Sequence, residues 1–519
     1  TPLAAVETPF VESIEVRVVN VDVVVTDRTG APMDGLTRED FELYEDGNRV
    51  DVEYFSKSSA GEFVDAAVSE PREVRSAVTW ALFVDQTNVK FGRRNQALRE
   101  LRTFLERGMA AGDRAILTTY DGFTFRARGS ITEDRAVLLR TLEQLEKERV
   151  QLGRLAVRET MIRGEIEQVV DPYDEAAPIA RSIFTLIEEE ANRTQGAIRA
   201  MGSLLDVLDG FEGRIAVVYV GAGFNMLPAI NITEAWRRRF PDLVMTPQAP
   251  RPENRRVELT RDANRLYDRL SAARATVYTI HAGDPGGAPI SPEDSGTQET
   301  TGSMGGDGQL TEIGSARGMA ERTGGRFFTT NPGLHRQLER VRTDLDHSYS
   351  LGYKPSGAPG QSRAIRVRVK VDGARVRYRE AVRERSTDEQ AADATVAALF
   401  DPRESNPLGV TIETSPVKQR KMPVRVSVPL DALTFLPQAD VHHAGVIFHF
   451  ALSASDGSIW RLGSRELPLA IAQKDLARAL REKVSYSVDV PMQGRGLRLA
   501  VSVQDRIGQT RSIVIVALD

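Results

Sequence analysis

The stretch WALFVDQTNVKFG, residues 80–92, decides how this sequence is expected to fold. Five mostly apolar residues lead into Asp85, and polar residues follow. The next segment, RRNQALRELRTFLERG, has the apolar spacing of an amphipathic helix. A buried strand that leads directly into a helix is typical of a parallel sheet with both faces covered.

The same alternation of apolar strand and helix continues to about residue 346. Strand-like runs occur at RAILTTY, RIAVVYVG, ATVYTIHA and GGRFFTT, with amphipathic segments between them. We therefore expect a doubly wound, mainly parallel α/β domain over residues 77–346. Two segments interrupt it: 148–195 inserts charged helical sequence, and 283–309 is rich in Gly, Ser, Pro and Thr and is expected to be a flexible loop.

Strand patterns flank this domain on both sides. Residues 10–70 and 347–385 alternate apolar and polar positions and contain Asp-Gly hairpin signals, so we expect two β segments that pair with each other. The polar stretch 386–397 is expected to be a linker. In 398–519, six or seven strand-like runs predict an immunoglobulin-like β-sandwich. The expected fold class is α/β plus β.

The composition limits the class of protein. A chain of 519 residues exceeds what one hydrophobic core supports, so several domains are expected. The net charge is -5, and Lys and Arg are scattered among Asp and Glu, so nucleic acid is not an expected partner. No apolar run approaches the roughly 18 residues that a transmembrane helix needs.

The compartment is suggested by two further features. The sequence contains no cysteine, which excludes disulfides, thiol catalysis and cysteine-ligated metals and mildly favours an oxidising environment. The sequence begins at Thr1, which we interpret as the result of removing a secretion signal. We expect an extracytoplasmic protein, whether periplasmic, cell-surface or secreted, with a cytoplasmic chain as the alternative.

Several motifs together carry a family resemblance. They are LFVDQTN, AGDRAILTTYDG, RIAVVYVGAGF and ARGMAERTGGRFF, with VNVDVVVTDRTGAPMDGLTREDFELYEDG before them and YSLGYKP after them. Over roughly residues 10–385, the chain resembles the von Willebrand factor type A domain, and more narrowly the acidobacterial-type VWFA-related proteins. The resemblance implies a domain that binds other proteins.

The resemblance also implies a metal-ion-dependent adhesion site. In the family this site uses Asp-x-Ser-x-Ser, a Thr from a second loop and an Asp after the fourth strand. Asp85 matches the first aspartate and Thr87 stands for the first serine, whereas Val89 and Ala222 occupy two other ligand positions. Two interpretations stay open: a weak Mg or Ca site at Asp85 and Thr87, or a degenerate site whose Asp85 bonds its own loop or caps the next helix.

Other motifs point to chemistry less strongly. VVYVGAGF begins like a dinucleotide fingerprint, but Met226 stands at the third glycine position. In DVHHAGVIFHF, His442 faces the opposite side of the strand from His443 and His449, so a local zinc site is not expected.

An enzyme site is not expected either. No nucleophile elbow, Walker loop or His-Glu-x-x-His helix occurs in the sequence. Asp121 and His281 are the strand-end residues that an enzyme site near Asp85 would use.

The expected function is a non-catalytic, extracytoplasmic protein-interaction or adhesion module with a degenerate metal site. The first alternative is a structural subunit of a cell-surface or periplasmic assembly, in which the chain forms a homo-oligomer or joins a larger complex. The second is an enzyme or enzyme subunit with its site at the same crevice. The charged segment 148–195 is either an ordinary amphipathic face or a docking surface for the partner.

Overall fold

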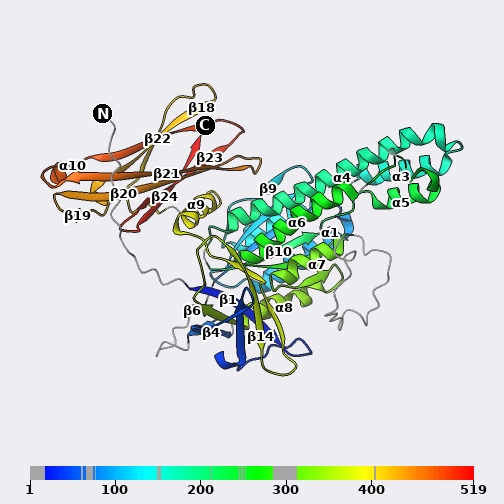
Figure 1. Cartoon of the computed structure of the whole chain (residues 1–519), viewed down its shortest axis with the longest axis horizontal. Helices are drawn as coiled ribbons and strands as arrows, with labels where there is room; N and C mark the ends of the chain where they lie inside the picture. The colour runs from blue at the N-terminus through cyan, green and yellow to red at the C-terminus, as the bar shows by residue number, and fades with distance from the viewer. Residues whose placement is uncertain are drawn as a thin grey trace.

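The computed structural model describes residues 18–59, 62–65, 74–75, 77–148, 153–211, 213–244, 246, 249–251, 253–283, 312–401 and 405–518. They form a central α/β domain, two β-sandwiches and a projecting arm of helices (Figure 1). The C-terminal sandwich and the arm lie on opposite sides of the central domain. Residues 10–17 of the expected first β segment and nearly all of the loop expected at 283–309 lie outside the described residues.

The centre of the fold is a six-stranded sheet. β7 pairs in parallel with β10 and with β8, and β8 pairs antiparallel with β9 at one edge. The chain first adds strands on one side of β7 and then on the other, so its direction of winding reverses between β7 and β10. This mainly parallel order is consistent with the resemblance to the type A domain. From edge to edge the strands are β12 (Phe327–Thr329), β11 (Ala275–His281), β10 (Arg214–Gly221), β7 (Val78–Asp85), β8 (Arg114–Tyr120) and β9 (Phe125–Ala127).

Helices cover both faces of this central sheet. All of β7 is buried, and its side chains alternate between two cores, with Trp80 and Leu82 on one side and Ala81 and Phe83 on the other. The expected doubly wound sheet is therefore confirmed. The first core contains α1 (Phe91–Gly108), α2 (Arg135–Lys147) and α8 (Leu334–Asp346), and the second contains α4 (Pro172–Leu208), α6 (Glu253–Ala272) and α7 (Glu312–Arg322).

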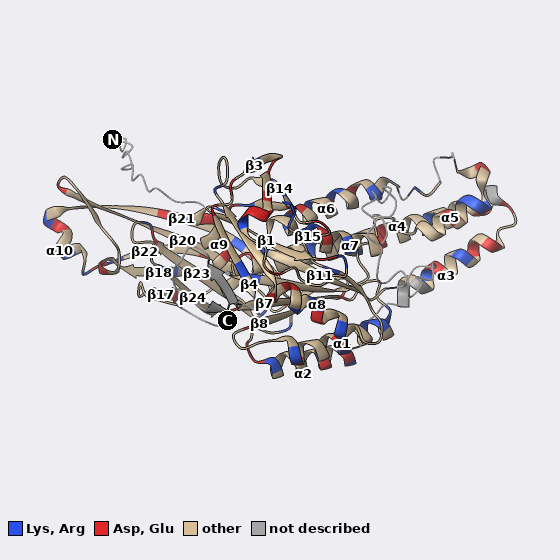
Figure 2. Cartoon of the chain, turned by 90° about the horizontal axis from the view of Figure 1, so that it is seen from below, with Lys and Arg blue, Asp and Glu red and all other residues tan. Residues whose placement is uncertain are grey.

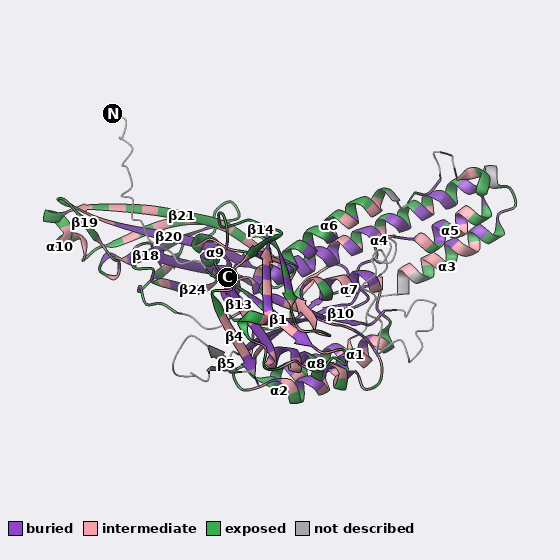
Figure 3. Ribbon diagram, turned by 60° about the horizontal axis from the view of Figure 1, so that its bottom comes forward, coloured by how far each residue is buried: buried purple, intermediate pink, exposed green. Residues whose placement is uncertain are grey.

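The arm consists of α3 (Gly153–Gln168), the N-terminal half of α4, and α5 (Ile230–Arg239). It has a small apolar core of its own, which includes Ile162, Ile183 and Trp236. The helical insertion was expected to end at residue 195, but α4 continues without a break to Leu208 and packs on the central sheet. The reason is that its apolar residues keep helical spacing across residue 195, as the buried stripe along α4 shows (Figure 3).

The β segments on either side of the α/β domain form one sandwich, so the α/β domain is inserted between its two halves. β1 (Val19–Thr26) pairs antiparallel with β13 (Ser348–Tyr353) and β15 (Arg375–Tyr378), and β2 (Phe41–Glu45) pairs with β14 (Ser362–Val369). The two sheets share one apolar core. The other strands are β3 (Asn48–Val50), β4 (Tyr54–Ser59), β5 (Glu62–Asp65), β6 (Val74–Arg75) and β16 (Ala381–Arg383).

The C-terminal region is a second sandwich of antiparallel sheets, with Val426 of one sheet and Phe448 of the other in a common core. The α/β plus β fold class is thus confirmed. One sheet contains β17 (Thr411–Thr414), β18 (Lys421–Pro429) and β22 (Lys483–Pro491). The other contains β19 (Leu436–Gln438), β20 (Val441–Ser453), β21 (Ile459–Ala472), β23 (Leu497–Asp505) and β24 (Arg511–Leu518), and a short helix, α10 (Leu476–Ala479), follows β21.

The stretch 386–397, expected to be a linker, is instead largely helix, α9 (Thr387–Ala398). Ser386 and Glu389 form a reciprocal capping box that starts the helix. α9 contacts α4 on one side and β20 and β23 on the other, so it joins the α/β domain to the C-terminal sandwich. Of its six buried residues three are alanines and two are polar, so the sequence shows no clear hydrophobic periodicity.

Candidate functional site

The candidate site lies at the carboxyl end of the central sheet, between β7 and β10. Ligands of doubly wound sheets bind outside the carboxyl ends of the strands, where the winding direction reverses. Asp85 ends β7 and Gly221 ends β10, so their loops border this point. The fold therefore places Asp85 where a ligand-binding residue is expected.

Asp85 is fully buried, and both of its carboxylate oxygens already accept hydrogen bonds. Oδ1 accepts the backbone N–H of Thr87 at 2.9 Å and the Thr87 hydroxyl at 2.6 Å. Oδ2 accepts the hydroxyl of Tyr219, from β10, at 2.9 Å. Asp85 and Tyr219 are both 0% exposed, so this hydrogen bond links the ends of the paired strands β7 and β10 inside the protein.

The environment of Asp85 favours its neutral form. Burial raises the pKa of Asp85 from 3.8 to about 6, and the hydrogen bonds from Thr87 and Tyr219 limit the rise. Tyr219 is affected in turn: burial and the neighbouring carboxylate raise its pKa well above its usual range. At pH 7, above this pKa, Asp85 is a buried carboxylate surrounded by the hydrogen-bond donors of Thr87 and Tyr219.

The side chains at this point do not fit a hard cation. Such an ion needs six or more oxygen ligands, but Val89 and Ala222, at two of the family's ligand positions, supply no side-chain oxygen and are buried. The Thr87 hydroxyl, the second expected ligand, donates to Asp85. Within the described part of the chain, no group of three or more His, Cys, Asp or Glu side chains is placed to hold a metal.

The loop after β7 is fixed by a buried arginine that the sequence did not reveal. Arg94, on α1, is 0% exposed and donates through Nη1 to Oε1 of Gln86 at 2.8 Å. Its Nη2 donates to the carbonyls of Leu145 and Glu148 at the end of α2. Burial lowers the pKa of Arg94, and nearby glutamates oppose the decrease. No local signal distinguishes Arg94 from the exposed basic residues of the same helix.

The glycines of VGAGF serve packing. A β-carbon added at Gly221 would lie 2.4 Å from the hydroxyl of Tyr219. Gly223 has a φ of +100°, and a β-carbon there would lie 2.0 Å from the carbonyl oxygen of Glu312. The segment that begins like a dinucleotide fingerprint is thus filled by the protein's own atoms.

The residues considered for an enzyme site, Asp121 and His281, are each hydrogen-bonded to backbone groups at this end of the sheet. Oδ1 of Asp121 accepts the backbone N–H groups of Phe123 and Thr124 at 3.0 and 2.8 Å. His281 is 1% exposed, and its Nδ1 lies 2.9 Å from the carbonyl oxygen of Ala222. Asp121 thus stabilises the turn after β8, and His281 links the end of β11 to the loop after β10.

A second carboxyl with a shifted pKa lies on α4, at the base of the arm. Glu190 accepts the backbone N–H of Ala229 at 2.7 Å and the side-chain amide of Asn225 at 3.3 Å. Burial raises the pKa of Glu190 to about 7, although the N–H of Ala229 lowers it. The sequence does not indicate this role, because the burial of Glu190 depends on the loop after β10 folding against α4.

Exposed apolar side chains gather on the arm and on one loop at its base. On α3, Val157 and Met161 are 58% and 62% exposed, and on α4 Phe184 is 38% exposed. In the loop after β8, Phe123 is 81% exposed and lies beneath the guanidinium of Arg193 on α4. Basic and acidic residues both occur along the arm helices, so the arm has no face of a single charge (Figure 2).

Comparisons with known proteins give loose structural matches, of which two are described below. No protein-family model matches the sequence, and no curated protein matches it. The chain is similar to an aerotolerance-related membrane protein from Bacteroides fragilis, with 12% identity and a TM-score of 0.25 over 52% of this chain and 99% of that one. It is also similar to three N-terminal domains of the type V pili tip protein Mfa5 from Porphyromonas gingivalis, with 10% identity and a TM-score of 0.26 over 92% of this chain and 76% of that one.

The membrane question has a limited answer. Among the described residues, no helix has both the length and the apolar character to cross a bilayer.

Proposed function

We propose that this chain is a non-catalytic protein-interaction module of an extracytoplasmic compartment, and that it binds its partner without a bridging metal ion. The observation that carries the proposal is the buried state of Asp85, whose two oxygens are engaged by Thr87 and Tyr219. In adhesive type A domains a partner's carboxylate completes the coordination of the metal. Both oxygens of the buried Asp85 already accept hydrogen bonds, so neither is free to coordinate a metal ion that a partner's carboxylate would reach.

The arm supplies the surface for the partner in this proposal. Its own core holds α3, α4 and α5 together, while Val157, Met161 and Phe123 expose apolar area beside charges of both signs. Protein interfaces commonly combine apolar and aromatic anchors with a polar rim. α5 of the arm follows the carboxyl end of β10, and Asp85 ends the neighbouring strand β7, so in this proposal the partner binds at the same end of the sheet as the family's site.

The compartment and the absence of catalysis are part of the same proposal. The lack of cysteine suits an oxidising compartment. Catalysis would require a reactive group that a substrate reaches, and Asp85, the carboxyl at the switch point, is 0% exposed.

Site-specific photocrosslinking tests the proposal. A photoreactive amino acid at Met161 or at Phe123 is expected to give one covalent adduct of defined mass with an envelope protein in the native cells, in equal yield with and without EDTA. The matched control is Val137 on α2, an apolar residue 40% exposed on the other side of the domain, where no such adduct is expected.

Three results would count against the proposal. Equal labelling from Val137 would mean that the arm is not selective, and loss of the adduct in EDTA would restore a metal-bridged mechanism. An adduct made solely with further copies of this chain, together with a stable oligomer in light scattering, would favour the structural-subunit alternative.

A further inference from the structure

A pocket of about 550 Å³ lies at the amino end of the central sheet, opposite to Asp85. Its walls come from the start of β10 and β11, from β1, β4 and β13 of the first sandwich, and from the segment that leads into α9. Five arginines but only two carboxylates, Asp22 and Glu384, line this pocket, which we call the arginine pocket. The arginines are Arg214, Arg274, Arg379, Arg383 and Arg385.

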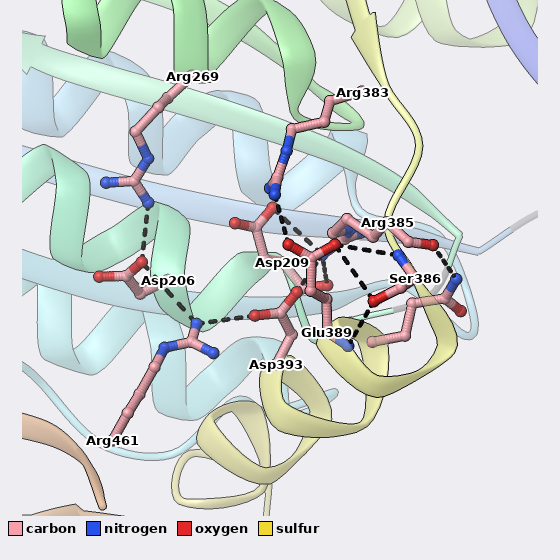
Figure 4. A network of polar contacts seen from close by, with 10 residues as sticks. Asp206, Asp209, Arg269, Arg383, Arg385, Ser386, Glu389, Asp393 and Arg461 are labelled. Atoms are coloured by element: carbon pink, nitrogen blue, oxygen red, sulfur yellow. Dashed lines mark hydrogen bonds and ion pairs between the residues drawn. The ribbon is translucent and has the colours of Figure 1, made fainter. Parts of the chain in front are cut away.

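Two of the arginines are held in place by carboxylates outside the lining. Arg383 pairs with Glu389, and Arg385 pairs with Asp393 at 2.9 Å and with Asp209 at 3.4 Å (Figure 4). The same network continues through Arg461 of the C-terminal sandwich, which reaches Asp393 at 2.8 Å. These pairs fix the wall of the pocket to α4 and α9.

Arg379 is positioned differently, because neutral carbonyls hold it. Its Nη1 donates to the carbonyl of Ala273 at 3.4 Å, and its Nη2 donates to the carbonyl of Asn20. Burial lowers the pKa of Arg379, Asp22 raises it, and the like charges of Arg274 and Arg385 lower it. Arg274 and Arg385 therefore repel Arg379, and an anion bound beside Arg379 would relieve that repulsion.

The N-terminal end of α9 also favours an anion in the arginine pocket. Ser386, Thr387 and Gln390 line the pocket, so the N-terminal end of a 12-residue helix faces it. Backbone N–H groups at a helix N-terminus favour negative charge. This contribution supports the arginines and would not make a site without them.

We propose that the arginine pocket binds a small organic anion that carries at least two phosphate or carboxylate groups. The planar guanidinium fork suits both groups, because each offers two oxygens at the matching spacing. The volume lies within the range of pockets for small organic ligands. The ligand would contact the first sandwich, the α/β domain and the start of α9 together.

Calorimetric titration of the full chain tests the proposal, with pyrophosphate and citrate as separate probes at an ionic strength kept constant with sodium chloride. Saturable binding of one probe below about 1 mM is expected, and the preferred probe shows whether phosphate or carboxylate is the natural chemistry. Arg379→Gln and Arg383→Gln are each expected to weaken binding about tenfold or more, the amount typical of one charge-assisted hydrogen bond.

A control variant and the exposure of Arg383 make the outcome decisive. Arg140→Gln on α2 removes one exposed positive charge far from the pocket and should leave binding unchanged. Arg383 is 40% exposed, so Arg383→Gln carries the test alone if Arg379→Gln does not fold. Absence of saturable binding by either probe would overturn the proposal, as would equal affinity in wild type and Arg383→Gln.

Discussion

At the carboxyl end of the central sheet, Asp85 and Tyr219 bond to each other in a fully buried position, whereas at the amino end five arginines line a pocket of about 550 Å³. Doubly wound sheets ordinarily bind ligands at the carboxyl end. Here Thr87 and Tyr219 occupy the carboxyl end around Asp85, and the arginine pocket lies at the amino end. The difference teaches that a fold decides where a site can be built, while individual side chains decide whether it is present.

A variant that disrupts the carboxyl end of the central sheet should have the largest effect on stability. Replacing Arg94 by Met removes the donors to Gln86 and to the carbonyls that end α2, and is expected to lower the free energy of unfolding by about 3–5 kcal/mol. Urea denaturation measures the change. Arg99→Met, an exposed residue on the same helix, should cost less than about 0.5 kcal/mol, and a similar small loss for Arg94→Met would show that the buried network is not needed.

The buried charge at this end gives a pH-dependent prediction. The pKa of Asp85 is about 6 in the folded protein and ordinarily 3.8, so stability is lost as pH rises between these values, because the unfolded chain ionises first. Asp85→Asn removes this loss. Relative to wild type, the variant should gain up to about 3 kcal/mol between pH 4 and pH 7, since the shift is roughly two pKa units.

Urea denaturation at pH 4, 5.5 and 7 measures this gain. The matched control is Asp121→Asn, whose carboxylate bonds a surface turn and should show no comparable gain. A constant difference between Asp85→Asn and wild type at all three pH values would contradict the buried-charge explanation.

At the amino end, the network that joins the domains should matter less. Asp393 pairs with Arg385 and Arg461, so Asp393→Ala leaves two arginines without this partner and is expected to cost about 1–3 kcal/mol. Asp206→Ala makes the comparison within the same network, because its pairs with Arg269 at 2.8 Å and with Arg461 at 3.9 Å are about half exposed and should be worth less than about 1 kcal/mol. Thermal denaturation of both variants would distinguish them, and equal losses would remove the special role of Asp393.

The smallest expected effect is that of divalent metal ions. Titration of Mg, Ca or Mn into chelator-treated protein should give no saturable heat, and EDTA should leave the melting temperature unchanged, because Asp85 has no free oxygen for an ion. Saturable binding below about 1 mM that Asp85→Ala abolishes would mean that Asp85 gives up its hydrogen bonds to coordinate a metal. The carboxyl end of the sheet would then be a ligand site as well as the amino end.

The sequence predicted the elements better than it predicted the contacts between them. The apolar run before Asp85 identified β7, and repetition of the strand–helix pattern identified the α/β domain. The partner of Asp85 could not be predicted, because Tyr219 is 134 residues away and is an ordinary strand tyrosine in the sequence.

The arginine pocket could not be predicted from the sequence for the same reason. Arg214 begins a strand of the central sheet, whereas Arg379 belongs to a turn of the first sandwich, and the insertion of one domain in the other brings them together. Hydrophobic periodicity reports which face of an element is buried, but it does not report which distant charges meet.

α4 is a single helix that connects the arm to the amino end of the central sheet. After Pro178 it runs 30 residues to Leu208, about 45 Å at 1.5 Å per residue, from the arm to the region beside Asp209 and the arginine pocket. Its first half packs in the core of the arm, and its second half packs on the central sheet and on α9. The arm and the joint with the C-terminal sandwich thus lie at two ends of one continuous helix, so a partner that rotated the arm would also load this joint.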